Sequence, residues 1–389
     1  MLKSFSIQAL SAGLLASFVG FASSFAVVLQ GLTAAGASQA EAASGLIALS
    51  ISMGLCAIWL SLKLKLPISV AWSTPGAALL ATSGAVEGGF AAAVGAFIVT
   101  GVLLVIAGLW KPLGRWVAAI PAPLANALLA GVLLGLCLAP VKAVAELPLL
   151  ALPIIIVWAV MARFTRIYAV PAAVVITAVI IATTTDMSAM KMNALWPDPI
   201  LVMPAFSPEA MIGIALPLFI VTMASQNIPG MAVLHANNYQ PNPSPLFATT
   251  GLFSLFSAPF GGHAVNLAAI TAALCAGENA HSDPARRYWA AVVAGVGYVF
   301  FGLIAGAATA FIAVAPPLLI QAVAGLALLG ALGMSLVNAF SDAKDREAAI
   351  VTFLVTASGL TFFGISGAFW GLLAGGAVMG LARWRRGKA

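Results

Sequence analysis

Charged residues are scarce in this sequence. They make up 7% of the 389 residues, whereas a typical soluble domain contains about 25%. All eleven carboxylates lie in or beside expected loops, which leaves no buried pair for general acid–base catalysis. The metalloprotease pattern HExxH and the phosphate-binding pattern GxxxxGK followed by Ser or Thr are also absent. These absences argue against an enzyme and against direct coupling to ATP.

Cysteine is rarer still. Cys56, Cys137 and Cys275 are isolated in apolar surroundings and have no paired spacing, so we expect neither a disulfide framework nor a metal site. No cofactor is expected. The net charge of +6 comes from basic residues in short loops, a distribution that indicates membrane orientation rather than nucleic-acid binding.

Apolar residues are abundant, at 62% of the chain, and they occur in runs nearly end to end. A membrane-spanning helix needs roughly 20 such residues. We therefore predict an all-α polytopic membrane protein with about 14 transmembrane segments, since the alternating pattern of an outer-membrane barrel is missing. The apolar run after Lys3, from about 9 to 34, is long and contains polar residues, so it favours a first membrane helix over a signal peptide.

The loop charges predict an orientation in the inner membrane. Basic residues gather in every second loop and in the C-terminal tail, whereas the intervening loops carry mostly Glu and Asp, with Lys142 and Lys191 as exceptions. By the positive-inside rule, both termini are then cytoplasmic.

An internal repeat divides the chain. The stretch PAPLANALLAGVLLG (121–135) resembles PPLLIQAVAGLALLG (316–330), and two interrupted segments have a similar offset. Seven segments per half would give the halves opposite topology, a common design of secondary transporters. We expect a first repeat at 1–185, an extracytoplasmic linker at 186–207 and a second repeat at 208–389.

The two interrupted segments, the third and the tenth, contain the most informative residues. AWSTPGAALL (71–80) and SAPFGGHAVNLAAITAAL (257–274) have proline and glycine where a continuous helix would need helix formers. We expect each to become a half-helix partway through the bilayer, starting at Pro75/Gly76 and near Ala264. Two such helix starts would bind an anion through free N–H groups. The alternative is that these residues only kink packed helices.

Other polar residues in the spans are further candidates. Gln226 and Asn227, next to Ser225, form the most polar point of any span; they could contact substrate or join helices by hydrogen bonds. His263, near Asn266, could relay a proton or act as a neutral hydrogen-bond donor. Ser24 could line the pocket or serve helix packing.

At these residues the sequence resembles the benzoate:proton symporter (BenE) family over essentially the whole chain. The resemblance is carried by AWSTPGAALL (71–80), LPLFIVTMASQNIPG (216–230), the SAPFGG–AAITAALC region (257–275), AGLALL (324–329) and FLVTASGLT (353–361). It implies import of benzoate or a related aromatic carboxylate with protons. The layout is similar to that of uracil:proton symporters and related anion transporters, which implies a core (1–119 and 208–314), a gate (120–185 and 315–389) and dimerisation through the gate helices.

The acidic residues that the uracil carriers use in segments 8 and 10 are replaced here, which leaves the proton site open between His263 and the substrate itself. A passive facilitator for small organic anions remains the alternative function. The expected partners are the aromatic carboxylate, the proton and membrane lipid. The expected substrate-binding residues are Phe21, Ser24, Phe25, Ser73, Thr74, Gly76, Gln226, Asn227, Gly262, His263 and Asn266.

Overall fold

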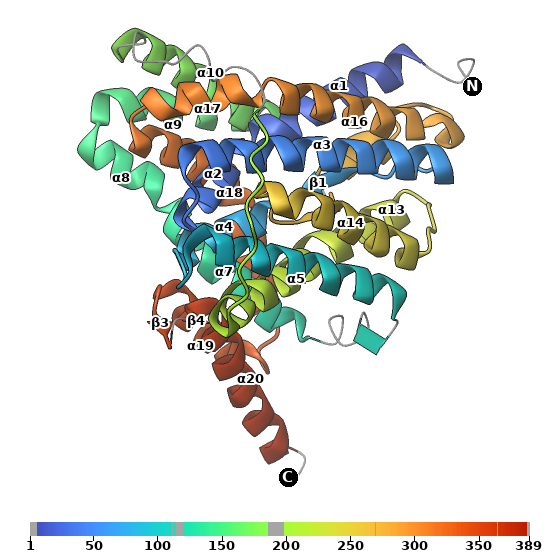
Figure 1. The fold of residues 1–389 in the computed structure, drawn as a ribbon. Coiled ribbons are helices and arrows are strands. Elements are labelled where there is room, and N and C mark those ends of the chain that lie inside the picture. Colours follow the sequence, from blue (N-terminus) through green and yellow to red (C-terminus); the bar gives the residue numbers. More distant parts are fainter. Residues whose placement is uncertain are drawn as a thin grey trace.

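The chain is almost entirely helical (Figure 1). The computed structural model describes residues 6–110, 112–113, 120–185, 198–268, 270–363 and 365–386. The elements of the first half are α1 (Ile7–Ala22), α2 (Phe25–Ala34), α3 (Gln39–Leu64), β1 (Val70–Trp72), α4 (Thr74–Ser83), α5 (Gly89–Leu109), α7 (Ala122–Cys137), α8 (Ala139–Glu146), α9 (Pro148–Phe164) and α10 (Arg166–Thr184).

The second half contains an interrupted eighth segment, a second short strand and the C-terminal helices. Its elements are α11 (Pro208–Ala210), η4 (Met211–Ala215), α12 (Leu216–Thr222), η5 (Met223–Asn227), α13 (Ile228–Ala236), α14 (Pro243–Ser257), η6 (Ala258–Phe260), β2 (Val265–Leu267), α15 (Ile270–Ala276), η7 (Pro284–Arg286), α16 (Tyr288–Leu303), α17 (Ala305–Val314), α18 (Pro317–Phe340), α19 (Arg346–Ala357), β3 (Thr361–Phe362), β4 (Ile365–Ser366) and α20 (Gly367–Arg386).

Several of these helices can cross a membrane. Within the described ranges, seven helical stretches are long and apolar enough to do so, or eight if α16 and α17, bent by 50°, form one span. Half-length helices such as α4 and α15 cannot cross alone, because a span needs roughly 20 residues. The all-α membrane fold is confirmed, whereas the number of 14 segments stays a prediction.

The two interrupted segments meet in a short antiparallel ladder. Val70 pairs with Leu267, and Trp72 pairs with Val265. Antiparallel pairing requires the two segments to run in opposite directions, as inverted repeats would. The expected helix start near Ala264 is wrong: 265–267 is extended because it pairs with β1, and α15 begins only at Ile270.

Two other spans are less regular than the sequence indicated. The first is divided between α1 and α2 at Ser23 and Ser24. The eighth contains two π-helical segments, η4 and η5, where Leu216 N–H and Ile228 N–H each bond the carbonyl five residues earlier. Such π turns often lie at functional sites.

Close backbone contacts hold the helices around the ladder. α3 lies along α16, α5 along α14 and α2 against α4 (Figure 1). A Cβ on Gly54 would lie 2.5 Å from the carbonyl oxygen of Gly295, and one on Gly31 would lie 2.3 Å from that of Ala77. Helices α7, α18, α19 and α20 pack together as a second group.

The described part of the expected linker, 198–207, is extended and packs against the helices instead of lying free. Ile200 N–H donates to Ser44 Oγ (2.8 Å), and Ala205 N–H donates to the carbonyl oxygen of Ala91 (2.9 Å). In Figure 1 this yellow-green segment crosses α3 on its way to α11. Residues 186–197 lie outside the described ranges.

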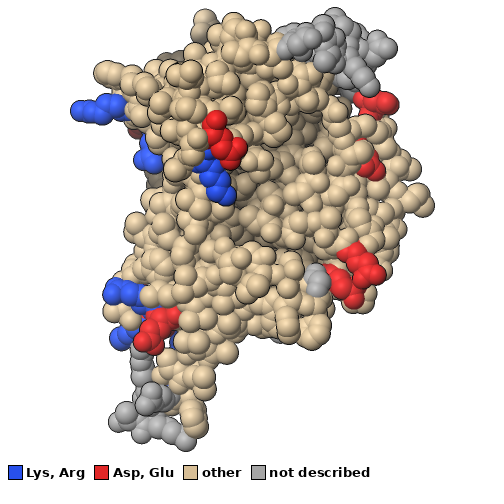
Figure 2. Space-filling model, turned by 90° about the vertical axis from the view of Figure 1, so that its left-hand side faces the viewer, with Lys and Arg blue, Asp and Glu red and all other residues tan. Residues whose placement is uncertain are grey.

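Most of the molecular surface is uncharged. Figure 2 shows a face on which charged side chains lie mostly at the edges, basic ones mainly on the left and acidic ones mainly on the right. A broad uncharged area separates them. Such a surface suits contact with lipid rather than water.

Candidate substrate-binding site

The N-terminus of α4 is the best-defined candidate for an anion site in the described structure. Ser73 is its N-cap, and its Oγ accepts hydrogen bonds from Gly76 N–H (3.1 Å) and from Thr222 Oγ1–H (2.9 Å). Because a hydroxyl oxygen has two lone pairs, both are then occupied. The buried Ser73 O–H has no acceptor among the described residues, so it is free to donate to a ligand.

Thr74 supplies two more free donors at the same helix start. Pro75 has no N–H, Gly76 N–H is bonded to Ser73 Oγ, and Ala77 N–H is bonded to the Ser73 carbonyl (2.8 Å). Within the described ranges, neither the N–H nor the hydroxyl of the half-buried Thr74 has a partner. The positive end of the helix dipole lies at this point, which favours an anion.

His263 lies directly beside this helix start. Its Nε2 is 2.9 Å from the carbonyl oxygen of Ser73, which can only accept, so Nε2 carries the hydrogen. The ring is fully buried, with its edge against Phe97 (centroids 6.3 Å apart), and Nδ1 has no partner in the described part of the chain. This geometry suits a neutral hydrogen-bond donor that holds β2 against the start of α4.

Asn227 and Asn266 mainly hold the ladder. Asn227 Oδ1 accepts from Leu267 N–H (2.9 Å), and Asn266 Nδ2 donates to the Leu267 carbonyl (2.9 Å). In the ladder's alternation Ala71 and Asn266 form a hydrogen-bonded pair, so the Asn266 N–H is engaged in the ladder. Asn266 Oδ1 is buried and unpartnered among the described residues.

Gln226 is the polar residue of this span that is free to bind. It is half-buried and lies in η5, four residues and about one turn after Thr222, whose hydroxyl bonds Ser73. No described residue bonds its amide. Thr222 itself was not among the predicted residues, although a hydroxyl one turn before Gln226 in an apolar span was a usable signal.

The two predicted glycines have different surroundings. A Cβ on Gly76 would lie 2.4 Å from Leu218 Cδ1, so this glycine allows α4 to pack against α12. Gly262 lies against Ser257, whose carbonyl already accepts the Gly262 N–H (3.0 Å). The structure therefore brings Gly76 to the helix start but does not leave Gly262 as a free donor.

An aromatic cluster lies next to the break in the first span. Phe21 stacks on Phe25 (5.4 Å between centroids, 8° between planes) and on Phe301 (5.0 Å, 22°). Trp72 contacts Phe21 and donates from Nε1 to Ser24 Oγ (2.8 Å), while Ser24 donates to the Gly20 carbonyl. Ser24 therefore positions Trp72, and Phe25 is half-buried, as is Phe301. Phe301 was not predicted.

The two half-helix starts do not converge on one point. They lie at opposite ends of the ladder. The ladder extends from Ser69 to Ser73, and four residue-to-residue steps in a strand span about 13 Å. One carboxylate can therefore contact only one of them. The start of α4, with three free donors, is the better site, since α15 has only seven described residues.

Comparison with known proteins now places the chain. The family model described as benzoate membrane transport protein (BenE) matches residues 3–381. The chain belongs to this family. As a member of the BenE family it is a multi-pass membrane transporter and not an enzyme, as its sequence indicated.

Two curated relatives align over nearly their whole length. "Inner membrane protein YdcO" of Escherichia coli K12 is 43% identical over 368 residues, which cover 94% of each chain. "Benzoate membrane transport protein" of Acinetobacter baylyi is 32% identical over 378 residues, which cover 96% of this chain and 94% of the relative.

Solved structures with the same fold are far more distant in sequence. The transmembrane domain of the cyanobacterial bicarbonate transporter BicA superposes with a TM-score of 0.59 at 15% identity, covering 95% of this chain and 98% of that one. A structure of SLC26A9 gives 0.68 at 14% identity, covering 98% and 66%, and the murine protein in the inward-facing state gives 0.65 at 14%, covering 99% and 69%. The BenE chain thus has the inverted-repeat, core-and-gate fold of these transporters.

Proposed function

We propose that this protein imports benzoate or a related aromatic carboxylate, together with protons, across the bacterial inner membrane by alternating access. The observation that carries the proposal is the start of α4, where Ser73 and Thr74 present three unpartnered donors beside an aromatic cluster. The family, the relative named as a benzoate transporter and the fold shared with anion transporters support the same substrate class.

In the proposed pose, the carboxylate accepts hydrogen bonds from Thr74 N–H, Thr74 O–H and Ser73 O–H. Hydrogen bonds to a charged group contribute about 1.5–3 kcal/mol each. Gln226 lies beside the carboxylate, and the substrate ring packs against Phe25 and displaces part of the Phe21 stack. The ladder and Trp72 are held in place by five of the predicted residues that lie behind the substrate: His263, Asn227, Asn266, Ser24 and Gly262.

The proton travels, in this proposal, on the substrate carboxyl. Burial away from water disfavours the charged form, and we propose that in the closed site this desolvation outweighs the three donors and the helix dipole, so that the carboxyl crosses as the neutral acid. His263 already donates to Ser73, and a second proton on Nδ1 would have no acceptor in the described structure. Proton coupling through His263 is therefore the less favoured route.

The position of the site supports the proposal of alternating access. α4 and η5 both contact α7, and α2 contacts α18, so the site faces the boundary between the proposed core (1–119 and 208–314) and gate (120–185 and 315–389). We propose that the core moves against the gate as a rigid body, that 186–207 links the repeats outside the membrane, and that the gate helices carry any homodimer. We also propose that both termini lie in the cytoplasm.

Uptake of labelled benzoate into proteoliposomes, with and without an inward proton gradient, tests the proposal. Thr74→Val and Gln226→Ala should each lower uptake at least tenfold. The matched control Thr82→Val, at the far end of α4 where the hydroxyl bonds the Ala78 carbonyl, should leave uptake unchanged. His263→Ala should still concentrate substrate if the carboxyl carries the proton.

The outcomes separate the alternatives. Uptake that only reaches equilibrium, whatever the proton gradient, would refute symport and favour a passive facilitator. The free donors at the start of α4 would suit a facilitator equally well. Uptake of other aromatic acids but not benzoate would keep the site and change the substrate. An equal loss of uptake in Thr74→Val and Thr82→Val would show that the substrate does not bind at the start of α4.

A further inference from the structure

A deep apolar groove runs between α1 and α16, on the outside of the helix pair. It encloses about 630 Å³ and is lined by Leu10, Leu14, Ser17, Phe18, Trp289, Val292, Val293, Val296, Gly297, Phe300 and Phe301. Its floor is narrow because Gly297 and Ser17 touch: a Cβ on Gly297 would lie 2.2 Å from Ser17 Oγ. Larger side chains on both helices form the walls, of which Val296 is 56% exposed.

The lining of the groove suits a hydrocarbon chain and no polar ligand. The hydroxyl of Ser17 donates to the Leu14 carbonyl (2.9 Å), and the other polar side-chain group of the lining, the indole N–H of Trp289, lies at one end of the groove. Along the rest of the groove a carboxylate would find no free donor and would lose its hydration. The substrate is therefore excluded as the occupant, whereas a lipid acyl chain matches both the shape and the chemistry.

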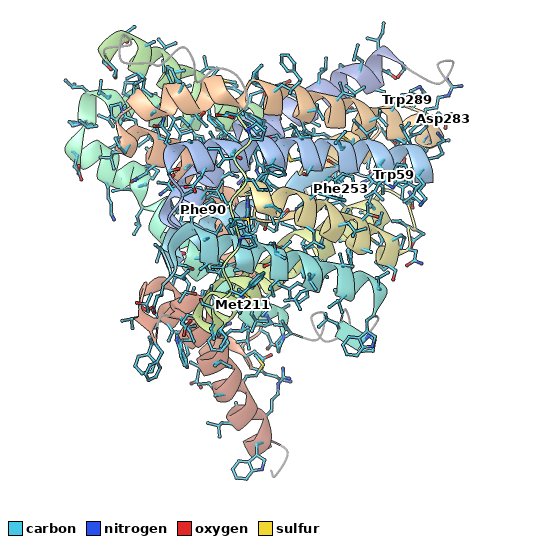
Figure 3. All side chains as sticks on the ribbon, viewed as in Figure 1. Trp59, Phe90, Met211, Phe253, Asp283 and Trp289 are labelled. Carbon is cyan, nitrogen blue, oxygen red and sulfur yellow. The ribbon has the colours of Figure 1, made fainter. Side chains whose placement is uncertain are left out.

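Basic and aromatic residues surround one end of the groove. Trp289 lies there, its ring 5.2 Å from that of Tyr288, and Lys65 Nζ is 4.9 Å from the Tyr288 ring. Lys63 lies over Trp59 at 5.4 Å. Figure 3 shows Trp289, Asp283 and Trp59 at the same end of the molecule as the N-terminus. Aromatic rings beside lysines are typical of the membrane–water interface.

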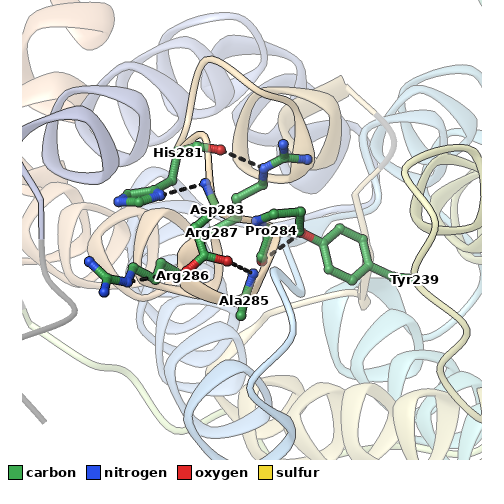
Figure 4. Close-up of polar contacts among 7 residues, drawn as sticks. All are labelled: Tyr239, His281, Asp283, Pro284, Ala285, Arg286 and Arg287. Carbon is green, nitrogen blue, oxygen red and sulfur yellow. Dashed lines mark hydrogen bonds and ion pairs between the residues drawn. The ribbon is translucent and has the colours of Figure 1, made fainter.

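The charge at this end is positive overall. Asp283 pairs with Arg286 (3.3 Å), and Glu278 is exposed in the same loop. These two negative charges are outnumbered by the four positive charges of Lys63, Lys65, Arg286 and Arg287. Arg287 is committed to the backbone, since it donates to the carbonyl of His281 (2.7 Å; Figure 4) and to that of Ala276 (2.8 Å). Lys63 and Lys65 have no carboxylate partner among the described residues, and Arg286, whose Nε contacts Asp283, still presents its terminal N–H groups to an anionic group.

We propose that the groove holds an acyl chain of an anionic phospholipid whose phosphate is bound by Lys65 and Arg286. Basic pockets between membrane helices are a common way to bind such headgroups. The far end of the groove includes Phe18 and Phe301, and Phe301 stacks on Phe21 of the aromatic cluster. A bound lipid therefore braces Phe301 against the wall of the candidate substrate site.

Lipid binding to the purified full-length protein tests this directly by native mass spectrometry, with dioleoyl phosphatidylglycerol and dioleoyl phosphatidylcholine as probes. We expect phosphatidylglycerol to be retained at least tenfold better. Val296→Trp, which fills the groove, should abolish retention. Val175→Trp, on α10 at the same 56% exposure, is its control and should not.

The headgroup contact has its own pair of variants. Lys65→Gln with Arg286→Gln should weaken phosphatidylglycerol retention at least fivefold, whereas Lys142→Gln with Arg163→Gln, which removes as much exposed charge elsewhere, should not. Equal retention of the two lipids, or equal effects of the two tryptophan variants, would overturn the proposal. No transport is measured, so the result stands whether or not benzoate is the substrate.

Discussion

The hydrogen bond between Thr222 and Ser73 allows a sharp prediction. Substitutions of its two partners should change the free energy of unfolding in one order and the affinity for benzoate in another. Replacing Ser73 by Ala removes the N-cap, which costs about 1 kcal/mol. It also leaves the buried Thr222 hydroxyl without its acceptor, which costs a further 1–3 kcal/mol or so. The free energy of unfolding should fall by about 2–4 kcal/mol, less if the hydroxyl turns to the carbonyl of Leu218.

Adding Thr222→Val to Ser73→Ala should restore part of this loss. With both hydroxyls gone, no buried donor is left unsatisfied, and only the N-cap loss of about 1 kcal/mol remains. Thr222→Val alone should be destabilising by about 1 kcal/mol, since Ser73 Oγ still accepts from Gly76 N–H. The double variant should therefore be more stable than Ser73→Ala, which thermal unfolding in detergent without substrate would measure.

Benzoate affinity should follow a different order. Ser73→Ala and the double variant both lack the donor to the carboxylate, so both should bind about 10- to 150-fold more weakly, equivalent to about 1.5–3 kcal/mol. Thr222→Val keeps that donor and should bind within a few fold of the unmodified protein. Calorimetric titration with benzoate measures each value. Undiminished affinity in Ser73→Ala, or a double variant less stable than Ser73→Ala, would refute this account of the helix start.

Three further predictions concern single contacts. Gly76→Ala should destabilise the protein by about 1–3 kcal/mol, because its Cβ would lie 2.4 Å from Leu218 Cδ1. Gly84→Ala is the comparison variant. Its Cβ would have no neighbour within 4 Å, but its φ is +72°, so it tests backbone strain without crowding. Trp72→Phe should lose about 1 kcal/mol with its bond to Ser24, measured as a lower melting temperature. Burial raises the pKa of the Tyr239 phenol, whose hydroxyl donates to Pro284 in the loop of Figure 4. The hydrogen bond of this hydroxyl stabilises the fold by about 1 kcal/mol. That stabilisation should be complete below the ordinary pKa of 10.0 and should be lost as pH rises through the folded pKa. The free energy of unfolding of Tyr239→Phe should therefore equal that of the unmodified protein only at high pH.

The start of α4 could be predicted from sequence because its signals are local. A serine N-cap followed by proline and glycine is typical of a helix beginning, and α4 begins at Thr74. The beginning of α15 could not be predicted, because 265–267 is extended only through its pairing with β1, nearly 200 residues earlier. Local propensity does not contain that information.

The break in the first span has the same origin. No proline or glycine stands at Ser23–Ser24, and serine is common inside membrane helices. The structure relates the break to Trp72, whose indole N–H bonds Ser24 Oγ from another segment. Which polar residues are free is likewise a tertiary property: Gln226 and Asn227 are adjacent in sequence, yet only Asn227 is committed to the ladder.

The ladder also explains why so few donors are available at this depth. Backbone groups inside a membrane must be paired, and those of β2 are: Val265 N–H bonds Ser254 Oγ (2.8 Å), Leu267 N–H bonds Asn227, and Asn266 pairs with Ala71. At α4, Pro75 removes one N–H and Ser73 takes another, so Thr74 N–H is the remaining first-turn donor. A carboxylate that binds Thr74 therefore pairs the last open backbone N–H of the helix start. Its recognition then follows from the same pairing rule that holds the two half-helices together.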